Sequence, residues 1–231
     1  VLEALGLGID LGPTDVAARA NFCTMNENGT IADRRAGRID TAVCRKLCDM
    51  LSEKIKKIED VDIQIKAGEG HRFVVVFRGK GLGGPLTDTD PHSEKMPIRP
   101  AVPVDNKSAK ARKMARIVAK LYEQMMPLLA GKKPTDGFLL RGIDTRPKMP
   151  SFLDRYKLRP AAIAIYPMYK GLASLVGMTR LDGPKNIAEQ FERYLAAYDN
   201  YDFFFIHFKY TDQYGEDGKF DMKRQAIEQF D

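Results

Sequence analysis

The alternation of hydrophobic and polar residues predicts regular elements from the N-terminal region onward. Ala17–Met25 and Thr30–Arg34 have the composition of short extended pieces, and Asn26–Gly29 between them is a hairpin turn signal. Apolar residues then recur at helical spacing over Thr41–Ile58, where Asp40 or Thr41 is the expected N-cap. The pattern therefore predicts a hairpin followed by a helix.

Two strands and a long helix are predicted next. Val61, Ile63 and Ile65 alternate with polar residues, which is typical of a half-buried strand, and Phe73–Phe77 is continuously apolar. Residues 107–126 form the clearest helix, with an apolar stripe on one face. The resulting β, α, β, β order predicts a compact α+β module.

The second half of the chain has a different pattern. A stretch rich in Gly, Lys and Pro, Gly131–Gly137, marks the expected boundary. The strands predicted beyond it are Phe138–Arg141, Ala161–Tyr166 and 201–206, and the helices are Tyr169–Met178, Asn186–Tyr198 and one from about Phe220. Asn186 and Glu189 have capping-box spacing. This alternation of strands and helices predicts a parallel sheet covered on both faces.

Composition indicates a soluble protein in a reducing compartment. The chain has 231 residues, 44% of them hydrophobic and 29% charged, enough for one large domain or two small ones. No apolar run approaches the ~20 residues of a membrane span, and no signal peptide is visible. Cys23, Cys44 and Cys48 are an odd number of cysteines and make no disulfide framework. We therefore expect a cytoplasmic protein without a membrane partner.

The charge balance narrows the choice of ligand. The net charge is +6, but Lys and Arg are spread along the chain, and no RNA-binding aromatic motif or helix-turn-helix pattern is present. Arginines that occur in pairs suit a small phosphorylated ligand at least as well as nucleic acid, because guanidinium binds phosphate through two hydrogen bonds. We expect a small-molecule ligand and no nucleic acid; the sequence does not indicate an oligomeric state.

A group of potential ligands follows the apolar stretch at 201–206. That stretch is typical of a fully buried strand of a parallel sheet, and ligands bind outside the carboxyl ends of such strands. Asp212 and Glu216 flank Gly215, which we interpret as a turn that lets both carboxylates bind one Mg²⁺ or Mn²⁺ ion. The alternative is a polar loop that only caps the next helix.

Two further features stand out. Gly79–Pro85 contains four glycines in six positions, which suits a phosphate-cradling loop but matches neither the P-loop nor the dinucleotide-binding pattern. A flexible surface loop is the alternative.

The sequence also lacks an initiator Met, and Asp231 falls inside a predicted amphipathic helix, so we expect a fragment of a longer protein.

Several short segments together carry a likeness to a known family. The most specific are Asp33–Ile39 and Thr87–His92; the others are Glu3–Gly6, Asp15–Phe22, Gly70–Arg72, Pro147–Phe152 and the segment around Asp212. In this order and spacing they resemble the archaeal-type cofactor-independent phosphoglycerate mutases of the alkaline phosphatase superfamily. The likeness covers essentially the whole chain.

The resemblance implies an α/β protein: part of an alkaline-phosphatase-like parallel-sheet domain plus an inserted α+β domain. Residues 1–9 would connect from a missing N-terminal catalytic segment, 10–137 would form the inserted substrate-binding domain, and 138–231 the truncated returning part of the metal-binding domain. The implied activity is interconversion of 3-phosphoglycerate and 2-phosphoglycerate through a phosphoserine, with two Mn²⁺ or Mg²⁺ ions and no 2,3-bisphosphoglycerate. Because the nucleophilic serine is not in this chain, we expect the fragment itself to be inactive.

The resemblance also assigns residues. Substrate binding would involve Arg19, Arg34, Arg35, Arg38, His71, Arg72, Asp88, Asp90 and His92. Lys148 would contact the transferred phosphate, and Asp212 and Glu216 would bind metal. Glu216 stands where the family has a histidine, and a carboxylate there adds negative charge and changes metal preference. The alternative function is a phosphatase or a non-catalytic phosphoester-binding relative of the same superfamily.

Overall fold

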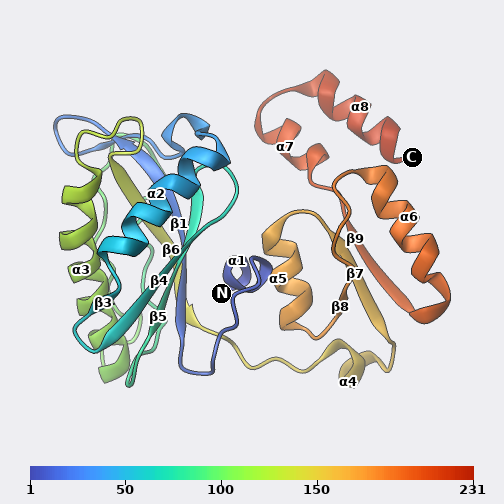
Figure 1. Ribbon diagram of the computed structural model, residues 1–231, viewed down its shortest axis with the longest axis horizontal. Helices are drawn as coiled ribbons and strands as arrows, with labels where there is room; N and C mark the ends of the chain where they lie inside the picture. Colours follow the sequence, from blue (N-terminus) through green and yellow to red (C-terminus); the bar gives the residue numbers. More distant parts are fainter. The chain divides into compact units, whose positions relative to one another are not determined.

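The computed structural model describes residues 1–231, which divide into two compact units. Unit 1 comprises Val1, Glu3 and Ile9–Pro147, and unit 2 comprises Leu2, Ala4–Gly8 and Lys148–Asp231. Unit 1 contains α2 and α3 of Figure 1, whereas unit 2 contains α1 and α4 to α8 apart from Glu3 of α1. Helices and both kinds of sheet occur, so the predicted mixed α/β fold class is confirmed.

Unit 1 is built on one antiparallel sheet. Strand β1 lies at its centre, between β5 and β6, and the order along the main path is β2-β1-β5-β4-β3. The strands are β1 (Val16–Met25), β2 (Ile31–Asp33), β3 (Lys57–Ile58), β4 (Val61–Ala67), β5 (Arg72–Arg78) and β6 (Gly137–Thr145). The predicted hairpin is confirmed, because β1 and β2 pair across the turn at Asn26–Gly29.

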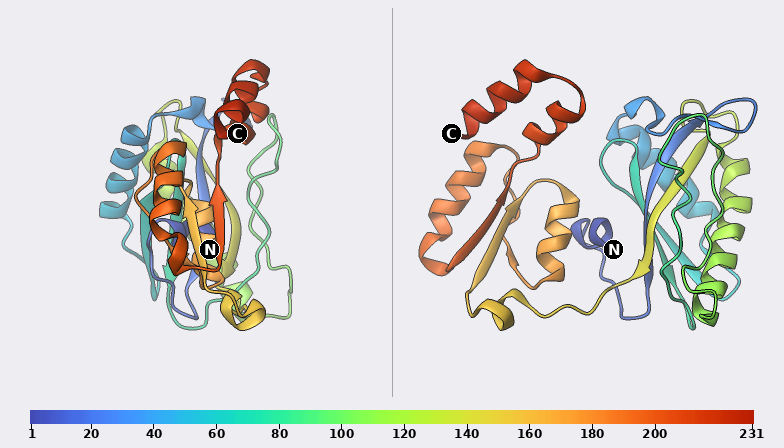
Figure 2. Two further views of the ribbon diagram at one scale, coloured as in Figure 1. Left: turned by 90° about the vertical axis from the view of Figure 1, so that its right-hand side faces the viewer. Right: turned by 180° about the vertical axis from the view of Figure 1, so that it is seen from behind.

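Two helices cover one face of this sheet (Figures 1 and 2). They are α2 (Thr41–Lys54) and α3 (Ala109–Leu129), with a short 3₁₀ turn, η1 (Ala36–Arg38), before α2. The stripe predicted on α3 is buried in the core: Met114, Ile117, Val118, Leu121 and Met125. Alternate residues of β1 join that core, so the residues between them, including Arg19, belong to the opposite face of the sheet.

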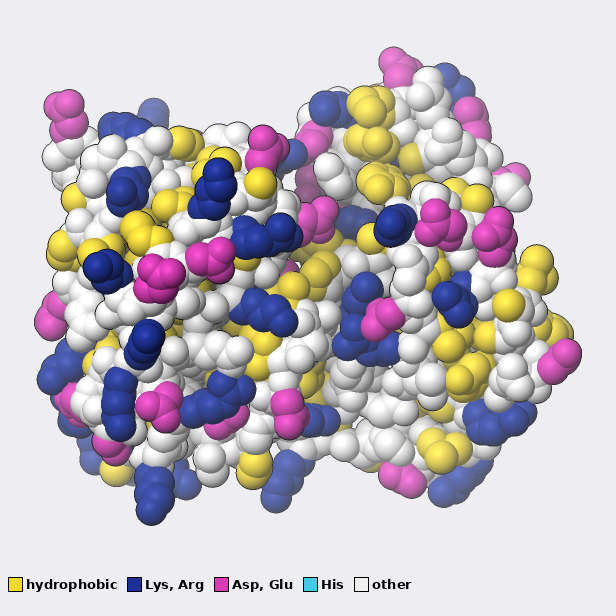
Figure 3. Space-filling model, viewed as in Figure 1, with side chains coloured by type: hydrophobic (Ala, Val, Ile, Leu, Met, Phe, Trp, Pro, Cys, Tyr) yellow, Lys and Arg dark blue, Asp and Glu magenta, His cyan; other side chains and the backbone are white.

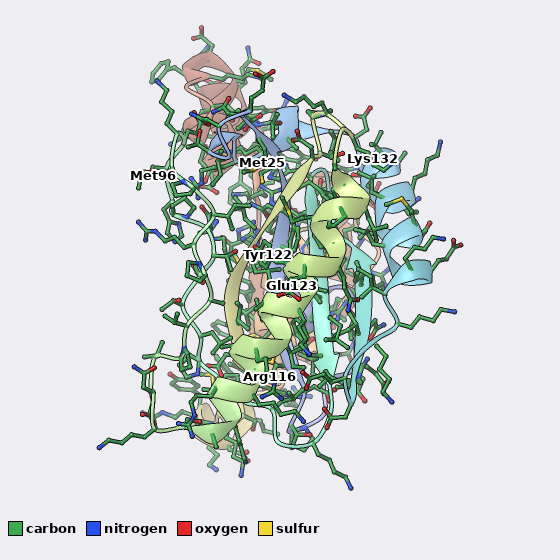
Figure 4. The ribbon with its side chains drawn as sticks, turned by 90° about the vertical axis from the view of Figure 1, so that its left-hand side faces the viewer. Met25, Met96, Arg116, Tyr122, Glu123 and Lys132 are labelled. Atoms are coloured by element: carbon green, nitrogen blue, oxygen red, sulfur yellow. The ribbon has the colours of Figure 1, made fainter.

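Tyr122 anchors α3 to β6. Figure 4 labels it on α3 together with Arg116 and Glu123. Its ring stacks on Phe138 with a centroid distance of 4.2 Å, and its hydroxyl lies 2.6 Å from the Thr89 hydroxyl. The Thr89 hydroxyl also accepts a hydrogen bond of 2.7 Å from the amide of Leu140. This network attaches the segment that carries Thr87–His92 to the sheet.

The glycine-rich segment Gly79–Pro85 packs closely and is not a flexible surface loop. Leu82 is buried in the core of unit 1. A Cβ atom at Gly84 would lie 2.8 Å from the Ile143 carbonyl oxygen, and one at Gly83 would lie 3.0 Å from Cβ of Lys110. Glycine is therefore needed here so that the chain can pass close to β6 and to the start of α3.

Unit 2 is built on a three-stranded parallel sheet, as predicted. Its order is β8-β7-β9, and its strands are β7 (Pro160–Ala164), β8 (Thr179–Arg180) and β9 (Phe203–His207). The helices are α1 (Leu2–Gly6), α4 (Phe152–Tyr156), α5 (Pro167–Leu175), α6 (Ile187–Ala197), α7 (Tyr210–Glu216) and α8 (Phe220–Phe230), with a 3₁₀ turn η2 (Tyr198–Asn200). Figure 1 shows α5 and α6 on opposite faces of this sheet.

The capping interaction predicted for α6 is confirmed. The Asn186 side chain accepts a hydrogen bond of 3.0 Å from the amide of Glu189. The Glu189 carboxylate in turn accepts from the Asn186 side chain at 2.7 Å and from the amide of Lys185 at 2.7 Å. These bonds satisfy donors that the first turn of the helix leaves unpaired.

The strand predicted at Phe138–Arg141 forms, but in the other sheet. It is part of β6, which pairs with β1 from Val16 opposite Thr145 to Cys23 opposite Gly137. The structure therefore divides the chain after Pro147, ten residues beyond the predicted boundary at 137. The glycine- and proline-rich stretch at Gly131–Gly137 connects α3 to β6 within unit 1.

Two expectations around β9 are also wrong. The strand is not fully buried: Phe203 is 36% exposed and the residues after it are half-buried, because β9 lies at an edge of the three-stranded sheet. Gly215 is not a turn between Asp212 and Glu216, since all three residues belong to α7. The left-handed turn falls later, at Gly218 with φ of 67°.

Among the helices of both units, none has the length and apolar character that crossing a membrane requires.

Candidate functional site

One face of the unit 1 sheet carries a group of arginines. Arg19 on β1 lies directly opposite Arg141 on β6. Arg72 on β5 lies opposite Asn21 of β1, and therefore one diagonal step from Arg19. Because Ala18, Ala20 and Leu140 belong to the core beneath α2 and α3, these guanidinium groups extend from the other face. We call Arg19, Arg72 and Arg141 the arginine face.

Asp90 is the most buried carboxylate beside this face. Its side chain is 0% exposed, and Arg34 donates two hydrogen bonds to it, from Nε at 2.9 Å and from Nη2 at 2.7 Å. Burial acts to raise the pKa of Asp90, but the bonds from Arg34 and from the His92 amide outweigh it and lower that pKa. Arg34 and Asp90 therefore form a fixed ion pair.

Asp88, which precedes Asp90 by two residues in the sequence, makes a second set of contacts. Its carboxylate lies 3.2 Å from Nε2 of His92 and accepts a hydrogen bond of 2.8 Å from the amide of Gly142. Gly142 has φ of 58°, next to the register shift in the β1–β6 pairing. Asp88 thus ties the Thr87–His92 segment to the irregular point of β6 that immediately follows Arg141.

The Asp33–Ile39 segment forms a tight left-handed turn. Its residues Ala36, Gly37 and Arg38 have φ values of 48°, 62° and 55°. The Asp33 carboxylate accepts hydrogen bonds from the amides of Arg35 at 2.8 Å and Gly37 at 2.6 Å. A left-handed conformation costs roughly 1–2 kcal/mol at each non-glycine residue, so Asp33 is what holds the exposed Arg35 and Arg38 in this arrangement.

His71 lies buried among these cations. It is 4% exposed, and its carbonyl oxygen accepts a hydrogen bond of 2.9 Å from the amide of Phe22. Burial, followed by the positive charges of Arg72, Arg35 and Arg19, lowers the pKa of His71 to about 3. The imidazole is therefore neutral at neutral pH and is available as a neutral hydrogen-bonding group.

The low pKa of His71 predicts acid sensitivity. The unfolded state binds a proton near pH 6.5 and the folded state near pH 3, so stability is complete above pH 6.5 and falls as the pH is lowered from 6.5 toward 3. Between pH 7 and pH 5 we expect this residue alone to remove about 2 kcal/mol. Urea unfolding at both pH values should show a smaller difference for His71→Asn than for wild type. An equal difference in the two proteins would contradict the assignment.

The second group of candidate residues lies at the carboxyl ends of parallel strands in unit 2. His207 ends β9, and its ring stacks on Tyr169 with a centroid distance of 3.4 Å. Burial, then the charge of Lys209, lowers the pKa of His207. The Lys209 ammonium group lies 5.7 Å from the Tyr166 ring and forms an ion pair with Asp212. A polar edge therefore exists where ligands of parallel sheets bind.

The carboxylates at this edge fit a divalent ion only in part. Asp212 and Glu216 lie one turn apart on α7, both exposed, and supply the hard oxygen ligands that Mg²⁺ and Mn²⁺ prefer. No group of three or more His, Cys, Asp or Glu side chains in either unit is placed to hold a metal ion. This chain alone therefore provides an incomplete ligand set.

Of the residues predicted to bind substrate, unit 1 holds all nine, and contacts join several of them. Direct contacts link Arg34 with Asp90 and Asp88 with His92, while His71 experiences the charges of Arg19, Arg35 and Arg72. Arg141 of the arginine face was not among the predicted residues; it follows the apolar run Phe138–Leu140 and resembles an ordinary strand end. Its only sequence signal is a charged residue next to a glycine.

Charges are interspersed over the surface shown in Figure 3. Dark blue basic and magenta acidic side chains alternate on both units in that view, and no continuous basic stripe crosses the face shown. Lys148 is exposed at the beginning of unit 2, outside any helix or strand. The candidate anion-binding residues of this chain are therefore the arginine face and the other basic residues described above, not an extended basic surface on the face shown.

Solved structures define the class of fold. The chain aligns over 99% of its length with the cofactor-independent phosphoglycerate mutase of Thermoplasma acidophilum, covering 62% of that protein, with a TM-score of 0.62 and 29% sequence identity. A protein from Pyrococcus horikoshii shares the fold, with a TM-score of 0.70, 21% identity, 99% of this chain and 55% of the other covered. The chain thus has the fold of part of a phosphoglycerate mutase of the cofactor-independent class.

Sequence relatives give the family. The profile of 2,3-bisphosphoglycerate-independent phosphoglycerate mutase matches residues 1–134, and the chain belongs to that family. Proteins described as probable mutases of this kind are 45% identical over 231 residues in a Thermotoga species and 43% identical over 233 residues in Thermus thermophilus. The whole chain is matched in both, and it spans 57% of the length of each relative.

Proposed function

We propose that the full-length protein that carries this chain interconverts 3-phosphoglycerate and 2-phosphoglycerate through a phosphoserine, without 2,3-bisphosphoglycerate. The observation that carries the proposal is the arginine face of unit 1 beside the Arg34–Asp90 pair, in a chain of the mutase family. The substrate has one carboxylate and one phosphate, and guanidinium groups bind both through paired hydrogen bonds. Simple hydrolysis of a phosphate ester does not need a site that holds and turns the glycerate.

The two units would divide the work. We propose that unit 1 corresponds to the inserted substrate-binding domain expected at 10–137, extended by β6, and that it holds the glycerate with Arg19, Arg34 and Arg72. Unit 2 would contribute part of the phosphatase-like domain, with Lys148 contacting the transferred phosphate. The neutral imidazole of His71 can accept or donate a hydrogen bond beside the arginines without adding repulsion between cations.

A divalent ion belongs to this proposal. Asp212 and Glu216 would each give a carboxylate oxygen to Mn²⁺ or Mg²⁺, completed by ligands from outside this chain. When bound, such an ion neutralises charge on a phosphoryl group. Cys23, Cys44 and Cys48 are all free and buried, which supports placing the protein in the cytoplasm.

The test is a mutase assay on the full-length protein after chelation, coupled to enolase and without added bisphosphoglycerate. Addition of Mn²⁺ or Mg²⁺ should restore conversion of 3-phosphoglycerate, from a chelated rate at least about a hundredfold lower. Release of inorganic phosphate in place of 2-phosphoglycerate would identify a phosphatase. Binding of phosphoglycerate without any turnover would identify a non-catalytic relative and overturn the proposal.

A further inference from the structure

A groove in unit 1 runs between α3 and residues 97–103; Figure 4 labels Tyr122 on α3 and Met96 just before the facing segment. The groove encloses about 550 Å³, which is within the range of ligand-binding pockets. Its wall on α3 is a second apolar stripe, which shares Val118 with the stripe in the core: Ala115, Val118, Ala119, Tyr122 and Met126. This stripe has the spacing of one helix face and extends about 16 Å along the axis. The groove is therefore elongated and apolar. We call it the α3 groove.

Small side chains on one wall and prolines on the other keep the α3 groove open. Ala115 and Ala119 lie one helical turn apart, where larger residues would fill the space. Opposite them, the rings of Pro97, Pro100 and Pro103 restrict the backbone, and isolated β-bridges hold it at Pro97 and Pro103. The groove is thus present before any ligand binds, which lowers the cost of binding.

Thr89 joins the two walls of the groove. Its carbonyl oxygen accepts a hydrogen bond of 2.9 Å from the amide of Arg99, and its hydroxyl lies 2.6 Å from the hydroxyl of Tyr122. The Tyr122 hydroxyl also donates to the carbonyl oxygen of Phe138 at 3.1 Å. Because this hydroxyl has its partners inside the unit, Tyr122 offers the groove an aromatic ring and not a free polar group.

Arg99 supplies the only charge among the residues that line the groove. It is exposed, and no hydrogen bond or ion pair within the chain occupies its guanidinium group. An apolar wall beside one available guanidinium group complements a ligand with an apolar body and a single carboxylate. A cationic head group would be repelled there, and a neutral one would make weaker hydrogen bonds.

We propose that the α3 groove is a binding site for an amphiphilic carboxylate, with the apolar body against α3 and the carboxylate at Arg99. The site is distinct from the arginine face, because α3 covers the opposite side of the sheet. It takes a different class of ligand and takes no part in the mutase reaction proposed above. The two proposals therefore fail independently of each other.

The experiment is a calorimetric titration of the full-length protein with decanoate below its micelle concentration. Decanoate should bind with a dissociation constant of about 100 µM or tighter, because most of its chain leaves water. Decylammonium has the same chain and the opposite charge, so it should bind at least about tenfold more weakly. Arg99→Gln should weaken decanoate binding about tenfold, whereas Arg45→Gln, at an exposed position on α2, should leave it unchanged.

Ala119→Phe tests the groove itself, since the added ring fills the space beside residues 97–103. Ala119 is exposed, so this change leaves the core intact. Decanoate should bind at least about tenfold more weakly to this variant. The matched control is Gln124→Phe, which adds the same ring at an exposed position of α3 outside the groove. In wild type, decanoate should also slow hydrogen exchange of the Arg99 amide, which is bonded to Thr89.

Each outcome supports or overturns one part of the proposal. Equal affinity for decanoate and decylammonium, or unchanged binding in Arg99→Gln, overturns the carboxylate contact. Decanoate that binds wild type and Ala119→Phe equally well lies elsewhere, and an absence of binding at millimolar decanoate excludes the site; either result overturns the proposal. An equal loss of binding in Gln124→Phe would show a general effect of the added ring and overturn the assignment to the α3 groove.

Discussion

Replacing Asp212 by asparagine is expected to weaken Mn²⁺ binding by the full-length protein at least about tenfold and to lower metal-restored turnover at least about a hundredfold. Asparagine keeps the shape of the side chain and removes its charge, so the change isolates the carboxylate. Asp212 is exposed at the first turn of α7, just beyond the end of β9. It is therefore placed where ligands of a parallel sheet bind.

Glu216→Gln tests the second carboxylate in the same protein. Because Glu216 lies one turn further along α7, a shared ion predicts a loss of Mn²⁺ affinity similar to that of Asp212→Asn. Glu228→Gln on α8 is the control, since Glu228 pairs with Arg224 and lies outside this group. Calorimetric titration with Mn²⁺ gives the affinity independently of turnover. If only Asp212→Asn loses affinity, Glu216 is not a ligand.

The contact between Asp212 and Lys209 would contribute to the Mn²⁺ affinity that this titration measures. In the structure the ammonium group of Lys209 pairs with the carboxylate that a divalent ion would bind. Ion binding must then displace that contact, and the affinity includes its loss. A buried, preformed site would not require such an exchange.

Periodicity predicted most elements, but it did not determine which sheet each strand joins. The apolar run Phe138–Leu140 is buried on both faces of the sheet, and such a run looks the same in a covered antiparallel sheet and in a parallel one. Only its pairing with β1 assigns β6 to unit 1. The edge position of β9 was unpredictable for the same reason, because strand order depends on contacts between distant segments.

The candidate site could be predicted only in part from the sequence. The resemblance identified Arg34, Asp88 and Asp90 as candidates, and the structure joins Arg34 to Asp90. The resemblance did not show that the Asp90 carboxylate is buried, since burial depends on the packing of the whole unit. Arg141 was not among the predicted residues, because its place opposite Arg19 depends on a strand register that no local pattern specifies.

A further contact without any sequence signal joins α1 to α5 inside unit 2. A Cβ atom at Gly171 would lie 1.8 Å from the carbonyl oxygen of Leu2, and one at Gly6 would lie 1.7 Å from that of Pro167. The two backbones therefore touch through a pair of glycines. In sequence, a glycine within a helix only indicates a weaker helix, at a cost of about 1 kcal/mol relative to alanine.

Gly171→Ala should lower the free energy of unfolding by about 3 kcal/mol or more, because the added methyl group meets backbone that cannot move aside without displacing α1. The matched control is Gly215→Ala in α7, where the nearest atoms belong to the flexible side chain of Lys223, the closest at 3.1 Å. There alanine should be neutral or stabilising by about 0.5 kcal/mol, since it favours the helix. Urea unfolding of the full-length variants measures both. Equal effects at the two glycines would show that helix propensity, not contact between α1 and α5, requires Gly171.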